Sequence, residues 1–478
     1  NIDDATSWMD ATETAIKDVD GRLDNAITYV TQAATGTVNA KDRADITKQL
    51  DQYAQYIYEQ DMNSDYAGRY IFTGYRTDQA LLFDQAQDNV VYTIHEELDI
   101  NNINKYSYVY GRAEIGDTNI TDANYKNAQK YADEAPKFLD THRILVSYAD
   151  LMDATGSTAI TTTDSEGNSE TETYKHPFIV YKDKDGNEKF VNVTLKSISA
   201  DDVYNDHLKP GDNDIYLVKE TGELVFGDTI YDDIRGGKDL MITYEKNEFN
   251  KNDIRPEHYF TCSTVDTGTN ETAVYNTHPQ SEIDEMDTKG YYEQMSFRDQ
   301  TIQYQINFSQ TITVNTEGRN AVDTSFGRAV YDIKNQCNEL DVIEAKMAEV
   351  EKRIADLDES QDAERIADLT ELKSQLQTQI DLQKSVLVKG LGSMITTIQA
   401  AKQKINVALA GHGSRYIRMA MTENKLDELQ IDTEQAKSDN EDADLGEAYI
   451  NFTETNLLYQ ATLNATSKVL GQSLLDFI

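Results

Sequence analysis

Apolar residues recur every three or four positions over the first 66 residues, with one break near Gly36. This spacing places them on a single face of a helix. Asn39 or Asp42 could cap the second helical segment. We therefore expect two amphipathic helices here, each packing against one or two others. The residues that carry the stripe are Ile16, Val19, Leu23, Ile27, Val30, Ile46, Leu50, Tyr53 and Ile57.

The apolar period changes to two between about residues 70 and 316. Short alternating or apolar runs lie between turn signals there, and Asp185–Gly186 and Thr221–Gly222 each separate two such runs. These dipeptides are typical of β-hairpin turns. We expect two small, mainly β units, one inserted in the other. A Ser/Thr-rich loop or long hairpin at 155–173 and one helical island over 125–153 should interrupt the strands.

Helical spacing returns at about Phe326 and continues to the end of the chain. A heptad seam stops at 358–362 and then resumes at related spacing. This pattern favours an antiparallel helical hairpin over 335–390, and a continuous helix with a stutter is the alternative. The seam residues are Leu340, Ile343, Met347, Val350, Ile354, Leu357, Ile366, Leu369, Leu376, Ile380 and Leu387.

The last segment carries apolar residues seven positions apart up to the final residue. Chain ends usually fray, so an apolar seam at this place requires cover. Because Asn1 already lies inside a helical pattern, we expect the native N-terminus to be missing and to supply one partner helix. We also predict that the seam packs between subunits. The predicted interface residues are Leu445, Tyr449, Phe452, Tyr459, Leu463, Val469, Leu470, Leu474, Leu475, Phe477 and Ile478.

Together these patterns predict an α+β multidomain chain. Helices from both chain ends should form a long rod or coiled-coil bundle, with mainly-β outer domains inserted between them. Rod helices are expected at 1–75 and 321–440, and a terminal-core helix at 441–478. The outer region should span 76–320 as two subdomains, with an insertion at about 100–290.

Composition excludes several classes of partner. The 478 residues carry a formal net charge of −41, which would repel the phosphates of nucleic acids and anionic membranes. No apolar run approaches the ~20 residues of a membrane span, so we expect no membrane insertion. Cys262 and Cys337 are the only cysteines, and we expect both to be unpaired thiols.

The sequence contains no complete catalytic or metal-binding motif. His95 begins a HEEL stretch that lacks the second histidine of HExxH, and is expected in a strand or loop. Ser414 lies in AGHGSRY without the order of a nucleophile elbow. The DKDGNE stretch at 183–188 does not meet the frame of a calcium loop and reads as a hairpin tip. We expect a chain that is not an enzyme, with no catalytic, metal or cofactor-binding residues.

Two segments resemble the flagellin superfamily, and within it the hook-associated protein 3 family of the hook–filament junction. The first, DMNSDYAGRYIFTGYRTD at 61–78, is similar to that family's N-G-R-Y-[LIF]-F-[SA]-G-x-x-T signature, with Ala67 in place of the asparagine. The second, at 438–478, resembles the family's C-terminal region. Weaker likenesses occur at 310–322, where the chain should return from the β region, and at 413–419.

The signature marks the expected joint between the rod and the outer domain. Gly68 reads as a helix stop that can take positive φ, and Tyr70 to Phe72 read as a strand leaving the rod. In that strand Tyr70 and Phe72 should point to one face and Ile71 to the other. The residues assigned to this joint are Gly68, Arg69, Tyr70, Phe72 and Gly74.

The resemblance implies a non-enzymatic structural subunit of the bacterial flagellum, exported unfolded by the flagellar type III system to an extracellular site. Such subunits assemble through their helical ends and connect the hook, through another hook-associated protein, to the flagellin filament. The implied partners are copies of itself, that junction protein, flagellin, and a cytoplasmic export chaperone binding the C-terminal helix. The alternatives are flagellin itself, or a flagellin-like surface protein whose middle domain binds a glycan or host ligand.

Overall fold

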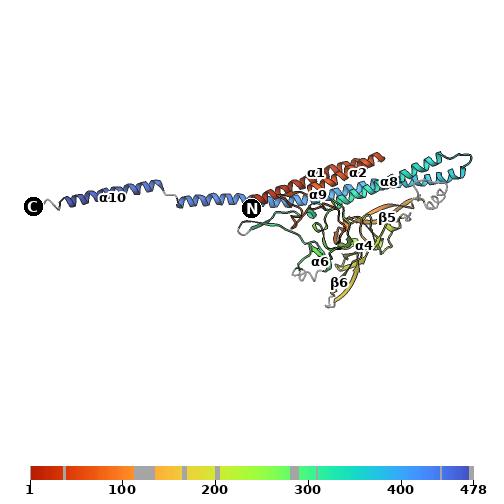
Figure 1. Cartoon of the computed structure of the whole chain (residues 1–478), viewed down its shortest axis with the longest axis horizontal. Helices are drawn as coiled ribbons and strands as arrows, with labels where there is room; N and C mark the ends of the chain where they lie inside the picture. The colour runs from red at the N-terminus through yellow and green to blue at the C-terminus, as the bar shows by residue number, and fades with distance from the viewer. Residues whose placement is uncertain are drawn as a thin grey trace.

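The structure is a computed structural model in which a helical rod carries a mainly-β outer domain on one side (Figure 1). This arrangement confirms the α+β class predicted from the sequence. The residues that the structure describes are 2–35, 39–111, 135–163, 169–199, 205–279, 282, 290–307, 310–441 and 444–472.

The rod is built from helices at both ends of the described chain. Its helices are α1 (Ile2–Thr35), α2 (Ala40–Gln55) with the π-helix η1 (Tyr56–Asp61), α8 (Ser325–Ala355) and α9 (Ala363–Glu441). Helix α1 runs antiparallel to α9, since Lys402 Nζ lies 2.6 Å from Asp20 Oδ1 while Thr6 contacts Met419 further along α9. The stripe predicted between Ile16 and Ile57 faces the shared apolar core of the rod.

Helices α8 and α9 form the predicted antiparallel hairpin. Glu351 pairs with Lys373, and Glu344 pairs with Lys384. Residues earlier in α8 therefore contact residues later in α9, as in an antiparallel pair. Asp358 Oδ1 accepts the Ser360 N–H at 2.8 Å within the turn. The single continuous helix, the alternative interpretation, is therefore wrong.

The start of α2 shows why the helix begins where the sequence indicated. The Asn39 side chain accepts the Asp42 N–H, and the Asp42 side chain accepts the Asn39 N–H, which is a capping box. One residue later, the fully buried Arg43 pairs with Asp341 and Glu344 of α8 and fixes α2 against the hairpin.

The outer domain contains two main sheets around one apolar core. The first has the strand order β15-β14-β3-β13-β8-β9, and the second has the order β10-β11-β12-β5-β4. All neighbouring strands are antiparallel except β10 and β11. Strands of the first sheet are β3 (Val90–Leu98), β8 (Phe178–Lys182), β9 (Glu188–Asn192), β13 (Lys238–Lys246), β14 (Thr261–Asp266) and β15 (Thr272–Tyr275). Strands of the second are β4 (Asn104–Tyr110), β5 (Lys137–Leu145), β10 (Thr194–Lys196), β11 (Ile215–Val218) and β12 (Glu223–Phe226).

Strand β13 illustrates how the sequence fills this core. It pairs with β3 from Leu240↔Leu98 to Lys246↔Tyr92. Ile242 faces the core between the two sheets, whereas Met241 faces a smaller cluster on the other side. A strand buried on both faces has neighbours on both sides of its sheet, as the central position of β13 requires.

Shorter elements complete the described chain. The ribbons are β1 (Asp65–Tyr66) with β2 (Arg69–Tyr70), β6 (Ser157–Thr163) with β7 (Ser169–Lys175), and β16 (Gln303–Asn307) with β17 (Gln310–Thr313). The short helices are η2 (Ile100–Asn102), η3 (Asp206–Leu208), α4 (Asp228–Arg235), η4 (Pro256–His258), α6 (Tyr291–Met295) and α7 (Gly318–Ala321). Beyond α9 lies α10 (Leu445–Gln472).

Several local predictions are confirmed, and one is wrong. Gly186 and Gly222 both have positive φ in hairpin turns, and the Ser/Thr-rich segment is the β6–β7 hairpin. The predicted helical island at 125–153 falls partly outside the described residues. Its described part contains strand β5, because Lys137–Leu145 lies between β12 and β4 and follows their pairing.

The structure also shows where the cysteines and the residues of the incomplete motifs lie. Cys262 and Cys337 are buried free thiols. His95 is a buried residue of β3 with Nδ1 2.9 Å from Thr243 Oγ1, and Ser414 lies within α9. Asp183 accepts the N–H groups of Asp185 and Asn187 at 2.9 Å in the β8–β9 turn. No described helix is both long and apolar enough to cross a membrane.

Candidate assembly surface and joint

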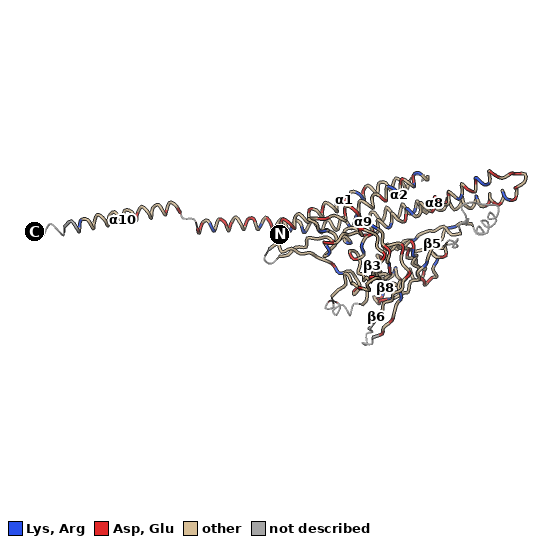
Figure 2. Tube along the Cα trace, viewed as in Figure 1, with Lys and Arg blue, Asp and Glu red and all other residues tan. Residues whose placement is uncertain are grey.

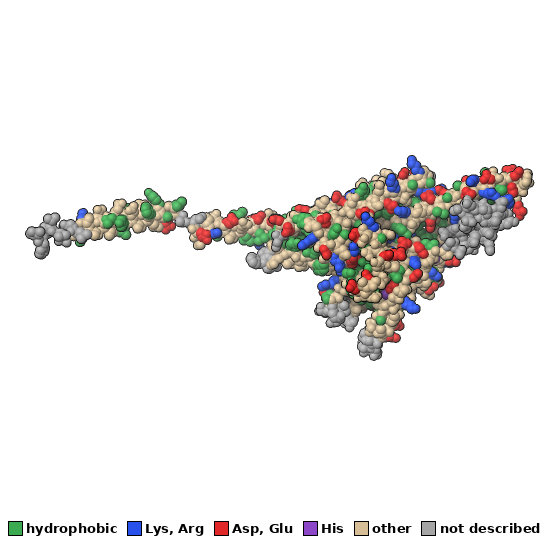
Figure 3. Space-filling model, viewed as in Figure 1, with side chains coloured by type: hydrophobic (Ala, Val, Ile, Leu, Met, Phe, Trp, Pro, Cys, Tyr) green, Lys and Arg blue, Asp and Glu red, His purple; other side chains and the backbone are tan. Residues whose placement is uncertain are grey.

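Helix α10 is the largest exposed apolar surface element of the described chain. Together with the last part of α9, it extends away from the body beyond the N-terminal end of α1 (Figure 1), and apolar side chains are distributed along it (Figure 3). Asp444 precedes the helix and caps its first turn, since its Oδ1 accepts the Gly446 N–H at 2.8 Å and the Glu447 N–H at 3.2 Å.

The predicted interface residues on α10 are all solvent-exposed where the structure describes them. Their exposed fractions are 83% for Leu445, 71% for Tyr449, 67% for Phe452, 63% for Tyr459, 52% for Leu463 and 70% for Val469. The Leu470 side chain and residues Leu474, Leu475, Phe477 and Ile478 lie outside the described residues.

The charged residues of α10 lie on one line along the helix. Glu447, Glu454 and Lys468 are separated by seven and fourteen positions. Glu454 follows Tyr449 by five residues and Phe452 by two, which places it about 140° and about 160° from these two seam residues around the helix axis. The exposed apolar residues Ile450, Leu457 and Leu458 follow Glu447 or Glu454 by three or four positions, so they border the line of charges on the face away from the seam.

This distribution differs from that of the α9 segment leading to α10. Acidic residues dominate residues 423–441, as Figure 2 shows between the body and α10. A helix that is apolar over most of its circumference is normally buried among several neighbours, whereas a strongly charged helix remains in water. The surface of α10 is therefore suited to packing with other helices on several sides.

The joint begins with a tight two-residue hairpin. Tyr66 pairs with Arg69 across a turn in which Ala67 has φ +51° and Gly68 has φ +76°. Positive φ at both central residues is the signature of a type I′ turn. The preceding helix ends at Asp61, so the prediction that Gly68 stops the helix is wrong, although its positive φ is confirmed. Arg69 is exposed, and the Tyr70 N–H donates to Thr77 O at 2.8 Å.

Beyond the hairpin, the chain crosses the core of the rod. Ile71 and Phe72 are both buried in that core, so the prediction that they face opposite sides of an emerging strand is wrong. The Phe72 carbonyl accepts the Gly318 N–H at 2.9 Å. Gly74 has φ +62°, and a Cβ at this position would clash with the Gln300 side chain. The joint is therefore formed by two segments: the one that leaves the rod and the one that returns from the outer domain, which contains Gln300 and Gly318.

Polar side chains of the returning segment complete the joint. The Gln300 side-chain oxygen accepts the Tyr75 N–H at 2.7 Å, and the Asn315 side-chain amide donates to Gln300 O at 2.7 Å. Arg415 of α9 donates to Asn315 O at 3.1 Å and to Thr316 Oγ1 at 2.8 Å. Gln300 and Asn315 were not identified from the sequence, because isolated polar residues in a β-rich region carry no local signal.

Glu317 makes the joint sensitive to pH. Its buried carboxylate accepts the Gln300 N–H at 2.9 Å, and burial raises its pKa to about 7 from the ordinary 4.5. A carboxyl with a raised pKa in the folded state stabilises the fold most below about pH 4.5 and loses that contribution as pH rises towards about 7.

We expect Glu317→Gln to stabilise the protein at pH 8 by up to roughly 3 kcal/mol, and much less at pH 4.5. Glutamine keeps the acceptor for the Gln300 N–H but cannot ionise. Urea unfolding of both proteins at the two pH values measures the difference. An equal shift at both pH values would contradict ionisation of Glu317 as the cause.

The described residues offer no grouping of three or more His, Cys, Asp or Glu side chains that could hold a metal ion. What the structure presents is an exposed apolar helix, α10, and a hydrogen-bonded joint between the rod and the outer domain.

Comparisons with known proteins identify the C-terminal part of the chain. Residues 395–478 match the family described as the bacterial flagellin C-terminal helical region, which confirms the predicted flagellin resemblance for this segment. No curated protein matches the chain by sequence.

Two solved structures give alignments over most of the chain. FlgL of Xanthomonas campestris is 10% identical, with 92% of this chain and 96% of that chain covered and a TM-score of 0.33. The flagellar junction protein FlgL of Legionella pneumophila is 11% identical, with 85% and 94% covered and a TM-score of 0.18. TM-scores this low do not establish a common arrangement of the domains.

Proposed function

We propose that this chain is a non-enzymatic structural subunit of the bacterial flagellum that joins the hook to the flagellin filament. The observation that carries the proposal is the exposed apolar helix α10, which lies inside the region matching the flagellin family. In this role the chain contacts copies of itself, the neighbouring hook-associated protein and flagellin.

Assembly through α10 accounts for its surface chemistry. Six seam residues are more than half exposed, and the charges are confined to one line. Burying such side chains releases about 1.5–3 kcal/mol each, so contacts between several subunits would stabilise the helix strongly. Head-to-tail contacts between identical subunits build rings or open tubes, depending on whether the rotation closes.

The joint favours a junction subunit over a filament subunit. The Gly68-to-Gly74 stretch is similar to the signature of the hook-associated protein 3 family, and this motif is not usual in flagellins. The structure explains why glycine occupies two positions of this stretch. Gly68 has positive φ in the hairpin turn, and Gly74 lies too close to Gln300 for a side chain.

The same surface requires protection before assembly. An exposed apolar helix promotes aggregation at the concentrations of the cytoplasm. We therefore propose that a cytoplasmic chaperone covers α10 before export. The unfolded chain then passes through the flagellar type III system to its extracellular position.

The position of the chain in the flagellum tests this function. We expect deletion of its gene to give cells that carry hooks without filaments and release flagellin into the medium. Gold labelling of the exposed β8–β9 turn in complemented cells should mark a narrow band between hook and filament.

Other outcomes would point elsewhere. Label along the whole filament, together with filament growth from the purified full-length chain alone, would identify a flagellin. Normal filaments and motility in the deletion strain would refute a junction role.

A further inference from the structure

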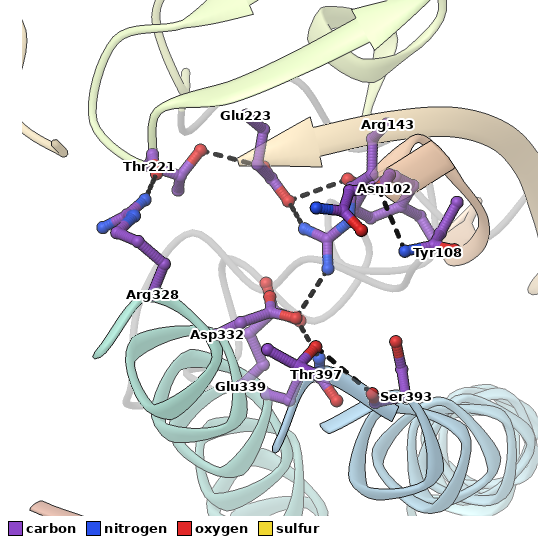
Figure 4. Close-up of polar contacts among 12 residues, drawn as sticks. Asn102, Tyr108, Arg143, Thr221, Glu223, Arg328, Asp332, Glu339, Ser393 and Thr397 are labelled. Carbon is purple, nitrogen blue, oxygen red and sulfur yellow. Dashed lines mark hydrogen bonds and ion pairs between the residues drawn. The ribbon is translucent and has the colours of Figure 1, made fainter. Parts of the chain in front are cut away.

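A second contact between the outer domain and the rod centres on Arg143 of β5 (Figure 4). Its guanidinium group is 6% exposed and pairs with Glu223 of β12, within the outer domain. The Tyr106 ring stacks against it at 3.5 Å from the ring centroid, and the Tyr108 hydroxyl donates to Glu223 Oε1 at 2.7 Å. Arg143 is thus held firmly by its own domain.

The other side of the same guanidinium group reaches the rod. Arg143 Nη2 lies 2.7 Å from Asp332 Oδ2 of α8. Nearby on α8, Arg328 donates to the Thr221 carbonyl, and the Tyr331 hydroxyl donates to the Glu220 carbonyl at 3.2 Å. Helix α8 therefore holds β5 and the β11–β12 turn through polar groups. We call Arg143, Glu223 and Asp332 the latch.

The latch differs in chemistry from the joint. The apolar core of the rod includes joint-side residues such as Leu82 and Tyr259, but no described side chain of β4, β5, β11 or β12. Apolar packing therefore continues from rod to outer domain at the joint, whereas the latch is polar. A cavity of about 740 Å³ is lined by two of the three latch residues, Arg143 and Asp332, and by Arg319 next to the joint.

A polar contact beside a cavity can open without exposing apolar surface. When the latch separates, the Arg143–Glu223 pair and the Tyr106 stacking stay within the outer domain, and Asp332 gains access to water. Separation at the joint would instead expose buried residues such as Phe72. Ion pairs of this kind often add little net stability but define geometry, and hydrated contacts between domains commonly allow motion.

We propose that the latch is releasable and sets the orientation of the outer domain, which swings about the joint when Asp332 separates from Arg143 and the neighbouring Arg328 and Tyr331 contacts open with it. The closed orientation is the one in the structure, and the open one keeps both the rod and the outer domain folded. Asp332 is thus a positioning residue for the whole outer domain.

Spin-label distances in the full chain test this device. Labels go on Lys184→Cys in the exposed β8–β9 turn and on Ala348→Cys at the exposed surface of α8. Cys262 and Cys337 are buried, and burial raises the pKa of both thiols, so they should remain unlabelled. We expect Asp332→Ala to increase the fraction of molecules at a second, different distance severalfold.

Asp341→Ala is the matched control. Asp341 is also an α8 carboxylate paired with an arginine, but its partner is Arg43 of α2, within the rod. The control should retain the parent distances. Identical distributions in Asp332→Ala and the parent would overturn the proposal. Loss of amide protection in β3 and β13 of Asp332→Ala would also overturn it, because Asp332 would then support the fold of the outer domain itself.

Discussion

Simultaneous replacement of Phe452, Tyr459 and Leu463 by aspartate is expected to abolish incorporation of the chain into flagella. These side chains lie on the seam of α10 and are exposed in the free chain. Losing their burial removes roughly 5–9 kcal/mol per subunit from assembly, and three carboxylates placed in an apolar interface add a further penalty. The rod and the outer domain should stay folded, because α10 extends away from both (Figure 1).

A matched triple variant distinguishes loss of the seam from a general effect of added negative charge. Glu454→Asp, Ala461→Asp and Lys468→Asp place carboxylates on the charged line of the same helix. We expect this variant to assemble. Electron microscopy of flagella measures assembly, and amide exchange of the monomer measures whether the rod and the outer domain stay folded.

The exchange measurement also tests the premise that α10 is uncovered before assembly. In dilute monomer, α10 should exchange much faster than α8 and the part of α9 within the rod. Protection of α10 equal to that of the rod helices would show a seam covered within one chain. Normal flagella from the Phe452, Tyr459 and Leu463 variant would show that the seam is not a contact in assembly.

The sequence was sufficient for features whose signal is local. The helical stripe from Ile16 to Leu23 is fully buried, because a spacing of three and four determines which face meets the rod. The break at 358–362 located the turn of the α8–α9 hairpin, since polar residues ended both seams at the same place. Exposure of the α10 seam agrees with the assembly role predicted for it, which remains a proposal.

The sequence failed where distant segments decide the structure. In the segment 137–145, the residues resembled part of a helix, but β12 and β4 on either side hold it as a strand. Alternation predicted opposite faces for Ile71 and Phe72. Both are buried, since the returning segment around Gly318 closes over the chain at that point. The latch was also hidden, because Arg143 and Asp332 are far apart in sequence.

A methyl group at Gly74 is expected to destabilise the protein through both its backbone conformation and a clash. Alanine there must adopt φ +62°, at about 1–2 kcal/mol, and its Cβ would clash with Gln300, at about 1–3 kcal/mol. Gly68→Ala is the matched control, since its φ is +76° but nothing lies within 4 Å of an added Cβ. We therefore expect Gly74→Ala to lower the free energy of unfolding by about 2–5 kcal/mol, and Gly68→Ala by only the conformational contribution of about 1–2 kcal/mol.

Trp8 provides the signal for this measurement. It is the single tryptophan, and its ring lies 6.2 Å from that of Tyr66, in the hairpin that opens the joint. Urea unfolding followed by its fluorescence therefore reports on the rod beside the joint. Equal losses for Gly68→Ala and Gly74→Ala would show that conformation alone requires glycine at both positions.

A second substitution isolates the contact with Gln300. In Gln300→Ala the side chain that meets the new Cβ is removed, together with the acceptor of the Tyr75 N–H. Gly74→Ala should then cost less in the Gln300→Ala background, by about 1 kcal/mol or more, because the two atoms nearest the new Cβ, Gln300 Oε1 and Cδ, are removed. Additive losses would mean that the outgoing and returning segments are not coupled through this contact. Coupled losses would show that glycine is required at position 74 because the outgoing and returning segments meet there. The sequence of the signature stretch alone does not reveal this constraint.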